Sequence, residues 1–560
     1  MHKPFACAAA LAAVCLHAYA APLPIIEKRG HATQLIVDGK PFLVLGGELH
    51  NSSASSIEYM VPIWPRLKQM NLNTVLSTVS WDMVEPEEGK YDFSNVDRQL
   101  DAARTQGLRL GIVWFGAYKN ARSTYAPGWV RRDTARFPRA ATSGAKPEFM
   151  SYPGAMPMPV LSPFSTQLQA AERRAFAAFL AHLKAVDPDH TVIMLQVDNE
   201  VGLLGDSRDR SKVAQAAWDA QVPPQLMAYL ERHRASLRPE LLDVWGRQKF
   251  RRNGTWEQVF GRDALAEEIF MAWAYGTYVE SVAQAANKTL PLPMYVNAWL
   301  GPQPGQPQPG DYPSGGPVAR MMDVWKAAAP SIALVAPDIY VDDVKGTLAD
   351  FHRADNPIFV PESRFKTVNL FRAIGEHNAL GWSVFGIEDL ASTKQLPQAY
   401  DVLGSMADVI LRAQERGTLH TVLLERDDPV PATLAGYSMT IRGMMAQLKK
   451  MMFDAGVAGP GGGAGASDKP GAPKKDPTSF GFVIAGGPGE FYLVGQDFMV
   501  DFARNGKLAE IDFVEEGRFK DGRWIAGRRL NGDELVTLLP ASSIGVVRVK
   551  LLEPGSSSPH

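Results

Sequence analysis

The chain has 560 residues, and its 58 basic side chains nearly balance its 60 acidic ones. This balance argues against the strongly basic surface that attracts phosphates, so we expect neither nucleic acid nor an anionic membrane surface as a partner. A chain of this length exceeds one ordinary domain but fits a large enzyme barrel followed by an accessory domain.

The first 20 residues predict a secretory signal peptide. A short charged start is followed by an apolar, Ala-rich run from Phe5 to Leu16 and by an A-x-A cleavage site that ends at Ala20. The run is shorter than the roughly 20 apolar residues that span a bilayer, and no later stretch qualifies, so we expect no membrane span. Cys7 and Cys15 would leave with the signal, so the mature protein would have no disulfide. These features predict a periplasmic or secreted protein.

Short apolar runs alternate with helical stretches from residue 42 to about residue 390. The eight runs are Phe42–Leu45, Thr74–Val79, Leu108–Trp114, Val192–Val197, Met294–Val296, Ile332–Val335, Ile358–Val360 and Trp382–Phe385. Strands separated by helices predict a parallel sheet with crossover connections, and eight such strands close a (β/α)8 barrel. The expected fold class is therefore α/β, with a TIM barrel over residues 21–400.

The crossover between the fourth and fifth predicted strands is unusually long. Helical patterns occur in it around Pro224–Leu237 and Ala264–Ala286. We expect this crossover to cap the barrel or to form part of the rim of its cleft.

Residues 401–555 have a different composition and predict a small all-β domain. After a helical pattern at Leu403–Arg416, short alternating runs are separated by Gly, Asp and Asn, as in a β domain. A Gly/Ala/Pro-rich tract at about residues 456–476 has no side chains with which to pack a core, and we expect a disordered loop there. The tract follows a helix and lacks a Gly-Lys-Ser/Thr ending, which argues against a phosphate loop.

Two predicted strands end in a glutamate. The run from Val192 leads into Asp198-Asn199-Glu200, and the run from Ile358 leads into Pro361-Glu362. Barrel enzymes place catalytic groups where strands emerge at their carboxyl ends. Glycoside hydrolysis needs two carboxyl groups, one as acid/base and one as nucleophile, so the pair predicts that chemistry.

Other polar and aromatic residues lie at the ends of the predicted strands, where a carbohydrate cleft would form. Asn199 suits a hydrogen bond to the sugar 2-hydroxyl. The candidate sugar contacts are Glu48, Asn51, Trp81, Trp114, Asn199, Trp299 and Tyr340.

Several motifs together resemble glycoside hydrolase family 35. They are Gly46-Gly-Glu-Leu-His-Asn-Ser52, Trp81 with Glu85-Pro-Glu-Glu-Gly89, Gln196-Val-Asp-Asn-Glu200 and Pro361-Glu-Ser363. The resemblance covers about residues 30–400 and implies a retaining exo-β-galactosidase of the large (β/α)8 clan. It implies that Glu200 is the acid/base, that Glu362 is the nucleophile and that Tyr340 hydrogen-bonds the nucleophile.

The chain departs from the familiar animal and fungal members of that family. Asn51 stands where they have Tyr, and Phe115-Gly-Ala-Tyr-Lys119 stands where an Ala-Glu pair holds galactose. The single small β domain resembles the compact bacterial branch, some of whose members trim galactose from xyloglucan oligosaccharides. The catalytic pair is intact, whereas the galactose contacts differ.

Alternatives remain at this stage. The same chemistry on another sugar, such as a β-glucoside, a β-mannoside or an α-L-arabinopyranoside, is one. A non-catalytic carbohydrate-binding protein on a hydrolase scaffold is another. The sequence contains no His-Glu-x-x-His motif, and Asp187-Pro-Asp189-His190 predicts a turn, so we expect neither a metal nor another cofactor. The expected partner is an oligosaccharide substrate.

Overall fold

The computed structural model describes residues 21–143, 159–392, 394–426, 428–457, 476–520 and 522–552. The predicted signal peptide and most of the predicted Gly-rich loop lie outside these ranges. None of the helices within them is long and apolar enough to cross a membrane.

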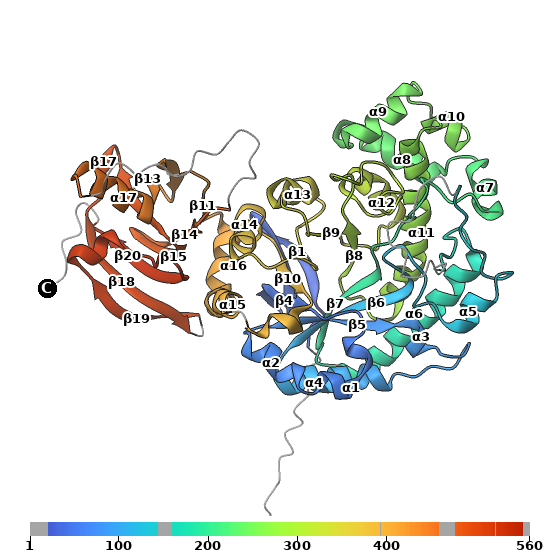
Figure 1. Ribbon diagram of the computed structural model, residues 1–560, viewed down its shortest axis with the longest axis horizontal. Helices are drawn as coiled ribbons and strands as arrows, with labels where there is room; N and C mark the ends of the chain where they lie inside the picture. The colour runs from blue at the N-terminus through green and yellow to red at the C-terminus, as the bar shows by residue number, and fades with distance from the viewer. Residues whose placement is uncertain are drawn as a thin grey trace, which may run out of the picture.

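Seven parallel strands form a curled sheet in the larger lobe (Figure 1). In spatial order they are β10 (Gly381–Phe385), β4 (Val44–Glu48), β5 (Thr74–Ser80), β6 (Arg109–Lys119), β7 (Val192–Asn199), β8 (Met294–Trp299) and β9 (Leu334–Asp338). Every residue of β7 is buried, as expected for a central parallel strand covered on both faces. This burial explains why the strand appears in the sequence as an almost continuous apolar run.

The seventh predicted strand, Ile358–Val360, closes the barrel by isolated bridges instead of a regular ladder. Val360 bridges to Trp382 on the β10 side, and Ser363 bridges to Ile339 just after β9. Between them, Pro361 has no backbone N–H to donate, which interrupts regular pairing. The predicted α/β barrel followed by β strands is confirmed, and the segment that carries Glu362 is its irregular closing strand.

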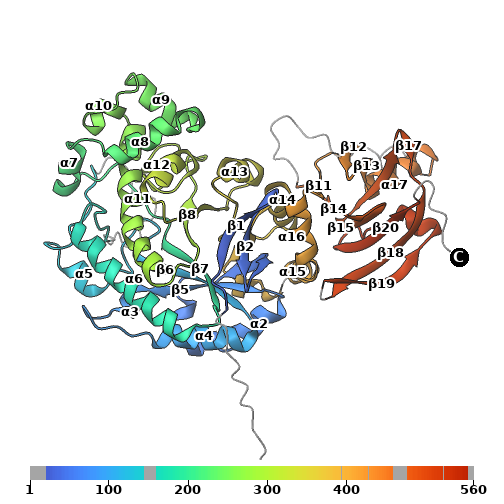
Figure 2. The same cartoon turned by 180° about the vertical axis from the view of Figure 1, so that it is seen from behind.

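Helices cover the outside of the barrel (Figures 1 and 2). They include α2 (Ile63–Gln69), α4 (Ser94–Gln106), α6 (Thr166–Val186), α11 (Ala264–Thr289), α12 (Met322–Ala328), α13 (Val344–Phe351) and α14 (Thr367–His377). The two longest, α6 and α11, pack against each other. Shorter helices in the same layer are α1 (Ile57–Met60), α3 (Trp81–Val84) and α5 (Gly128–Arg132).

The long crossover after β7 contributes a group of small helices. They are α7 (Lys212–Trp218), α8 (Pro224–Arg232), α9 (Pro239–Arg247) and α10 (Trp256–Phe260). They lie together at one end of the lobe, next to α11 and α12 (Figure 1). Their buried faces carry Trp and Leu side chains that join the main hydrophobic core.

An antiparallel sheet precedes the barrel. It contains β1 (Ile25–Arg29), β2 (Ala32–Val37) and β3 (Lys40–Phe42). Leu35 and Val37 of β2 pack with Val44, Leu76 and other inward side chains of the barrel strands. This sheet therefore closes the apolar interior of the barrel.

Two helices and two antiparallel sheets follow the barrel. The predicted boundary at residue 400 falls inside α15 (Gln395–Ser405), which α16 (Ala407–Arg416) follows. One sheet has the order β11 (Leu419–Leu424), β14 (Ser479–Gly487), β15 (Glu490–Gln496), β20 (Gly545–Leu551), β18 (Ile511–Lys520), β19 (Arg523–Leu530). The other has the order β12 (Val430–Leu434), β13 (Tyr437–Gly443), β16 (Phe498–Arg504), β17 (Lys507–Leu508), with α17 (Met444–Asp454) after β13. We call residues 419–457 and 476–552 the C-terminal β region.

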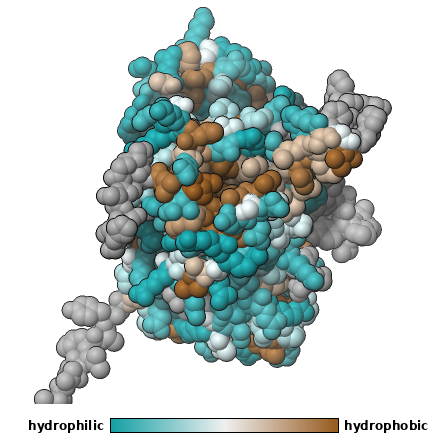
Figure 3. Space-filling model, turned by 90° about the vertical axis from the view of Figure 1, so that its left-hand side faces the viewer, coloured by the Kyte–Doolittle hydropathy of each residue, from teal (hydrophilic) through white to brown (hydrophobic). Residues whose placement is uncertain are grey.

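The C-terminal β region packs on α14 through aromatic side chains. The ring of Phe371 on α14 lies 4.7 Å from that of Phe482 and 5.3 Å from that of Phe480, measured between centroids. The opposite side of the region has a mixed surface, on which apolar residues gather amid hydrophilic ones (Figure 3). The region is thus attached to the barrel by a true hydrophobic core.

Candidate active site

A cavity of about 660 Å³ lies at the carboxyl ends of the barrel strands. Its lining comes from the ends of β6, β7, β8 and β9, from the closing strand and from the segment after β8. The lining residues are Asn51, Lys119, Asn120, Glu200, Trp299, Leu300, Gln303, Pro304, Gly305, Gln306, Asp338, Tyr340, Val341, Glu362, Arg364 and Phe385. Apart from Glu200 at its start, the long crossover after β7 contributes none of these lining residues, whereas the segment after β8 contributes Leu300 and residues 303–306. The expectation that the crossover caps the barrel or forms part of the cleft rim stays a prediction.

Glu362 accepts three hydrogen bonds inside this cavity. Tyr340 donates its hydroxyl to Oε2 at 2.7 Å, and the amide groups of Asn199 and Asn297 donate to Oε1, each at 3.2 Å. The side chain is 3% exposed. An ionised carboxylate has only acceptor sites, so three donors match that form. A carboxyl group held by three donors in this way suits a nucleophile.

Glu200 follows β7 in a strained backbone conformation. Its φ angle is +43°, in the left-handed region that a residue with a Cβ adopts at an energetic cost. The Glu200 N–H donates to Asn297 Oδ1 at 2.9 Å, which fixes this turn. Burial first, and then the charge of Glu362, raise the pKa of Glu200 to about 7, while Lys119 acts in the opposite direction. Glu200 can therefore hold a proton near neutral pH.

The side-chain amides of Asn199 and Asn297 are oriented by donors on their far sides. Lys119 donates to Asn199 Oδ1 at 2.9 Å, and the Glu200 N–H occupies Asn297 Oδ1. With each carbonyl oxygen engaged in this way, each NH2 group faces Glu362. The site thus presents two amide donors in a fixed direction.

Four buried carboxyl groups share the site. One oxygen each of Glu200, Asp338 and Glu362 lies within 4.8 Å of the others. Burial and the neighbouring Glu362 charge raise the pKa of Asp338 and of Glu48 well above their usual values. So many carboxylates cannot all be ionised together, and the site must hold protons at neutral pH.

The three close carboxyl groups are also the candidate metal ligands within the described residues, because their oxygens lie close enough to share one ion. Oxygens within 4.8 Å of each other also match the close spacing of catalytic carboxyl groups, about 5–5.5 Å apart in one class of glycosidases and about 6.5–9.5 Å in the other, better at the shorter of the two spacings. Glu362 already receives three hydrogen bonds from uncharged side chains. We therefore interpret the group as catalytic acids.

A bulge at the end of β6 brings Lys119 into the site. β6 pairs in constant register with β7 from Gly111 to Trp114, and the pairing then resumes with Lys119 opposite Asn199. Glu172 of α6 accepts the Ala117 N–H at 3.0 Å, and Asp198 accepts the Tyr118 N–H at 3.0 Å. Two buried carboxyl groups therefore hold the irregular segment in place.

Gly116 at the centre of this bulge cannot be replaced without movement. A Cβ atom at this position would lie 1.9 Å from an oxygen of Glu172. The close approach of backbone and carboxylate explains the glycine.

Seven of the nine sequence-predicted residues lie in or next to the site. Asn51, Glu200, Trp299, Tyr340 and Glu362 line the cavity. Asn199 contacts Glu362 through its amide. Glu48 is fully buried, and neither of its carboxyl oxygens has a hydrogen-bond partner among the described residues.

The predicted sugar contacts of Trp81 and Trp114 are wrong. Both side chains are fully buried and lie outside the cavity lining. Trp81 donates to Glu85 at 2.8 Å, and Trp114 donates to Glu172 at 3.0 Å while it packs on Phe176 and Phe179. Both tryptophans support the sheet from its helical side.

Asp338, Asn297 and Lys119 are parts of the site that the sequence did not single out as candidates. Asp338 and Asn297 follow the strand-end rule, since both lie at the carboxyl ends of predicted strands. Lys119 follows no such rule, because its place depends on the bulge.

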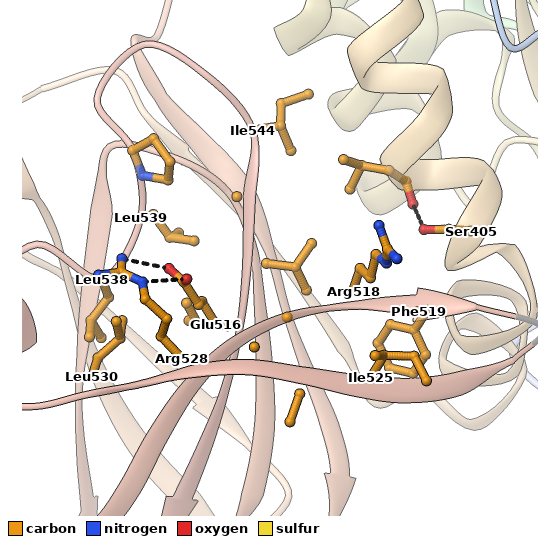
Figure 4. A pocket seen from close by; sticks show the side chains of 18 of the residues that line it. Ser405, Glu516, Arg518, Phe519, Ile525, Arg528, Leu530, Leu538, Leu539 and Ile544 are labelled. Atoms are coloured by element: carbon orange, nitrogen blue, oxygen red, sulfur yellow. Dashed lines mark hydrogen bonds and ion pairs between the residues drawn. The ribbon is translucent and has the colours of Figure 1, made fainter.

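A larger cavity of about 1030 Å³ lies between α15 and the C-terminal β region. Figure 4 shows Leu530, Leu538, Leu539 and Ile544 along it, with Arg528 paired to Glu516. Three acidic residues line this cavity. Two of them, Glu516 and Glu534, pair with Arg528, so the lining does not offer two carboxyl groups free of a cation. The candidate active site is therefore the smaller cavity at the barrel mouth.

Comparison with known proteins finds a family match in the first part of the barrel. Residues 34–152 match the family model of glycosyl hydrolases family 35, and residues 396–539 match a domain of unknown function (DUF5597). The predicted resemblance to family 35 is thereby confirmed. The matched part begins in β2 and includes β4, β5 and β6 of the barrel.

Curated relatives are similar over a short part of the chain. A β-galactosidase of Xanthomonas manihotis is 33% identical over 103 residues, 18% of this chain and 17% of that protein. β-Galactosidase 11 of Arabidopsis thaliana is 42% identical over 104 residues, 18% of this chain and 12% of that protein. The alignments therefore span less than a fifth of either relative.

Among solved structures, the β-galactosidase of Bacillus circulans sp. alkalophilus is 13% identical. The match covers 66% of this chain and 57% of that one, with a TM-score of 0.44. A similarity at this level carries no argument about the site or its substrate.

Proposed function

We propose that this protein is a retaining exo-β-galactosidase that releases terminal β-D-galactose from plant-type oligosaccharides. The observation that carries the proposal is the pair Glu200 and Glu362, whose carboxyl oxygens lie within 4.8 Å in two different environments. One carboxyl group can hold a proton near neutral pH, and the other accepts three hydrogen bonds. This asymmetry is what acid and nucleophile roles require.

The reaction proceeds in two displacements. Glu362 attacks the anomeric carbon while Glu200 gives its proton to the departing glycosidic oxygen, which yields a glycosyl ester and a free alcohol. Glu200, now ionised, takes a proton from water as the water attacks the same carbon and the ester bond breaks. Each step inverts the carbon, so the released sugar keeps the β configuration. Asn199 is placed to hydrogen-bond the 2-hydroxyl, and Tyr340 to hold the nucleophile.

Galactose as the sugar rests on the family 35 match and on relatives named as β-galactosidases. The cavity of about 660 Å³ has room for more than one sugar ring, and Trp299 with Gln303 and Gln306 lines part of it. Those side chains suit a carbohydrate leaving group, for which xyloglucan-derived oligosaccharides are the first class to test. An exported location for the enzyme rests on the N-terminal sequence alone.

A panel of nitrophenyl glycosides tests this proposal. We expect kcat/KM for the β-galactoside to exceed those for the β-glucoside, β-mannoside and α-L-arabinopyranoside by about 10-fold or more. Proton NMR should then show β-galactose as the first product. A higher kcat/KM for the β-glucoside or the β-mannoside would leave the proposed mechanism in place but would mean that the enzyme acts on a different sugar. The α-anomer appearing first would refute the double displacement, and sugar binding without turnover of any glycoside would favour a carbohydrate-binding protein.

A further inference from the structure

A buried cation lies among the acidic groups of the candidate active site. Lys119 is 6% exposed and lines the same cavity as Glu200 and Glu362. Its Nζ lies 5.2 Å from the centroid of the Phe115 ring, so one side of the ammonium group faces an aromatic surface. Placing a charge out of water is costly unless other groups compensate for it. Here the acidic groups of the candidate active site provide that compensation.

The first contact of Lys119 fixes an amide. Nζ donates to Asn199 Oδ1 at 2.9 Å, which leaves the NH2 group of Asn199 directed at Glu362 Oε1. Without this donor, only the bond to Glu362 would orient the carboxamide. With it, both ends are engaged, and a flipped amide would place its NH2 group against the ammonium and its oxygen against the Glu362 carboxylate. Lys119 thereby determines which end of Asn199 the substrate meets.

The second contribution of Lys119 is its charge. The groups that face Glu200 are Glu362 on the closing strand, Asp338 at the end of β9, and Lys119 at the end of β6. Glu48 at the end of β4 is also within range of the Glu200 charge. Of these four groups, Lys119 is the one whose charge favours the ionised form of Glu200, and a hydrogen bond with Asp338 acts in the same direction.

We propose that Lys119 is a positioning residue of the reaction, which fixes Asn199 and sets the upper pH limit at which Glu200 keeps its proton. This inference rests on the proposed function and extends it to a residue beyond the two glutamates. The bulge held by Glu172 and Asp198 is the means by which β6 delivers this side chain. The strained turn after it, with Asn120 at φ +49° and Ala121 at φ +55°, is tied to β7 by the bond from Ala121 N–H to Glu200 O at 3.1 Å.

The pH profile of Lys119→Met tests the inference. Removal of the positive charge makes ionised Glu200 less stable, so the alkaline limb of kcat/KM should move up by about one pH unit. At the optimum, kcat/KM should also fall about 10- to 100-fold, mostly through kcat, because Asn199 is no longer held. Lys119→Arg keeps the charge and should leave the alkaline limb in place.

Lys90→Met, a matched change of an exposed lysine, should reproduce the wild-type profile. An alkaline limb of Lys119→Met that coincides with the wild-type limb would overturn the inference. So would a rise in KM alone, which would make Lys119 a sugar contact instead.

A second measurement separates this inference from the proposed function. In protein labelled with ¹³C at the glutamate carboxyl carbons, the Glu200 resonance is identified by its loss in Glu200→Gln. Its titration midpoint should rise in Lys119→Met whether or not any glycoside is hydrolysed. An unchanged midpoint in the folded variant contradicts the role of Lys119. A raised midpoint in an enzyme inactive on all glycosides contradicts the proposed function alone.

Discussion

The barrel mouth and the contact between α14 and the C-terminal β region are both buried, yet they contain opposite kinds of group. At the mouth, four carboxyl groups and one ammonium share a small space, and both oxygens of Glu48 lack a partner among the described residues. At the contact, the rings of Phe371, Phe480 and Phe482 pack together. Gly375 allows the approach, since a Cβ there would lie 2.7 Å from Phe482.

The two regions serve different properties of the protein: the barrel mouth serves activity, and the aromatic contact serves stability. Like charges and unpaired polar atoms cost folding free energy, so the mouth is retained for its chemistry and not for its contribution to the fold. At the contact, burial of the aromatic rings contributes favourably to the folding free energy. Substitutions at the mouth should therefore abolish activity without unfolding the protein, and substitutions at the contact should do the opposite.

Glu362→Gln is expected to have the largest effect. The amide cannot form the glycosyl ester, so kcat should fall by about 10⁴-fold or more. The thermal midpoint should stay the same or rise, because one of several close negative charges is removed. Steady-state kinetics and calorimetry measure both.

The wild-type nucleophile should also be labelled by a fluorinated galactoside. Peptide mapping that locates the label on another residue would contradict the assignment of Glu362. Glu240→Gln, on the exposed side of α9, is the matched control and should change neither quantity.

Glu200→Ala should lower activity by an amount that depends on the leaving group. Substrates with poor leaving groups need the proton and should lose about 10²- to 10⁴-fold, whereas activated aryl galactosides should lose much less in the first step. External azide should restore turnover and give a β-galactosyl azide. Equal losses on both substrates, with no azide product, would mean that another group supplies the proton.

Phe482→Ala tests the other side of the comparison. Phe482 is fully buried, and truncation of such a side chain costs about 3–5 kcal/mol of unfolding free energy. Urea unfolding measures this loss, and kcat of the folded variant at 25 °C should stay within about twofold of wild type. Ile525→Ala, at a side chain 46% exposed in β19, is the control and should change little.

A loss of kcat in folded Phe482→Ala would contradict the statement that the aromatic contact contributes to stability and not to activity. It would mean that the contact also positions the mouth, since α14 follows the closing strand that carries Glu362.

The sequence located both active-site glutamates correctly, because each follows an apolar run that ends at the barrel mouth. β7 is buried throughout and ends at Asn199, so its apolar run located Glu200 within one residue. The closing strand pairs by bridges, yet its apolar residues are buried, and the same rule located Glu362.

The rule failed at β6, where the bulge after Trp114 shifts which residues face the mouth. A pattern of alternating faces cannot anticipate extra residues in one strand, so Trp114 was expected in the cleft and Lys119 was not. Trp81 was misplaced for a related reason, because the chain turns into α3 directly after β5. Hydrogen bonds that the backbone of β6 donates to Glu172 and Asp198, residues distant in sequence, decide the local structure there, and no local pattern contains them.

Glu200→Gln should give the smallest effect, a change in how stability depends on pH. The pKa of Glu200 is raised to about 7 in the folded protein, above its usual value near 4.5. A raised pKa means that the folded state binds the proton more tightly, so this contribution to stability is complete below about pH 4.5 and is lost as pH rises through 7. Glutamine has no proton to lose. The free energy of unfolding of the variant should therefore increase relative to that of the wild type as pH rises, by about 1–3 kcal/mol at pH 8, since one pKa unit corresponds to about 1.4 kcal/mol.

Urea midpoints at pH 5, 6, 7 and 8 measure the difference, with Glu240→Gln following the wild type throughout. Parallel curves for Glu200→Gln and wild type would show that Glu200 ionises as freely in the folded protein as in the unfolded chain, and the mouth would then not be under the strain that separates it from the aromatic contact.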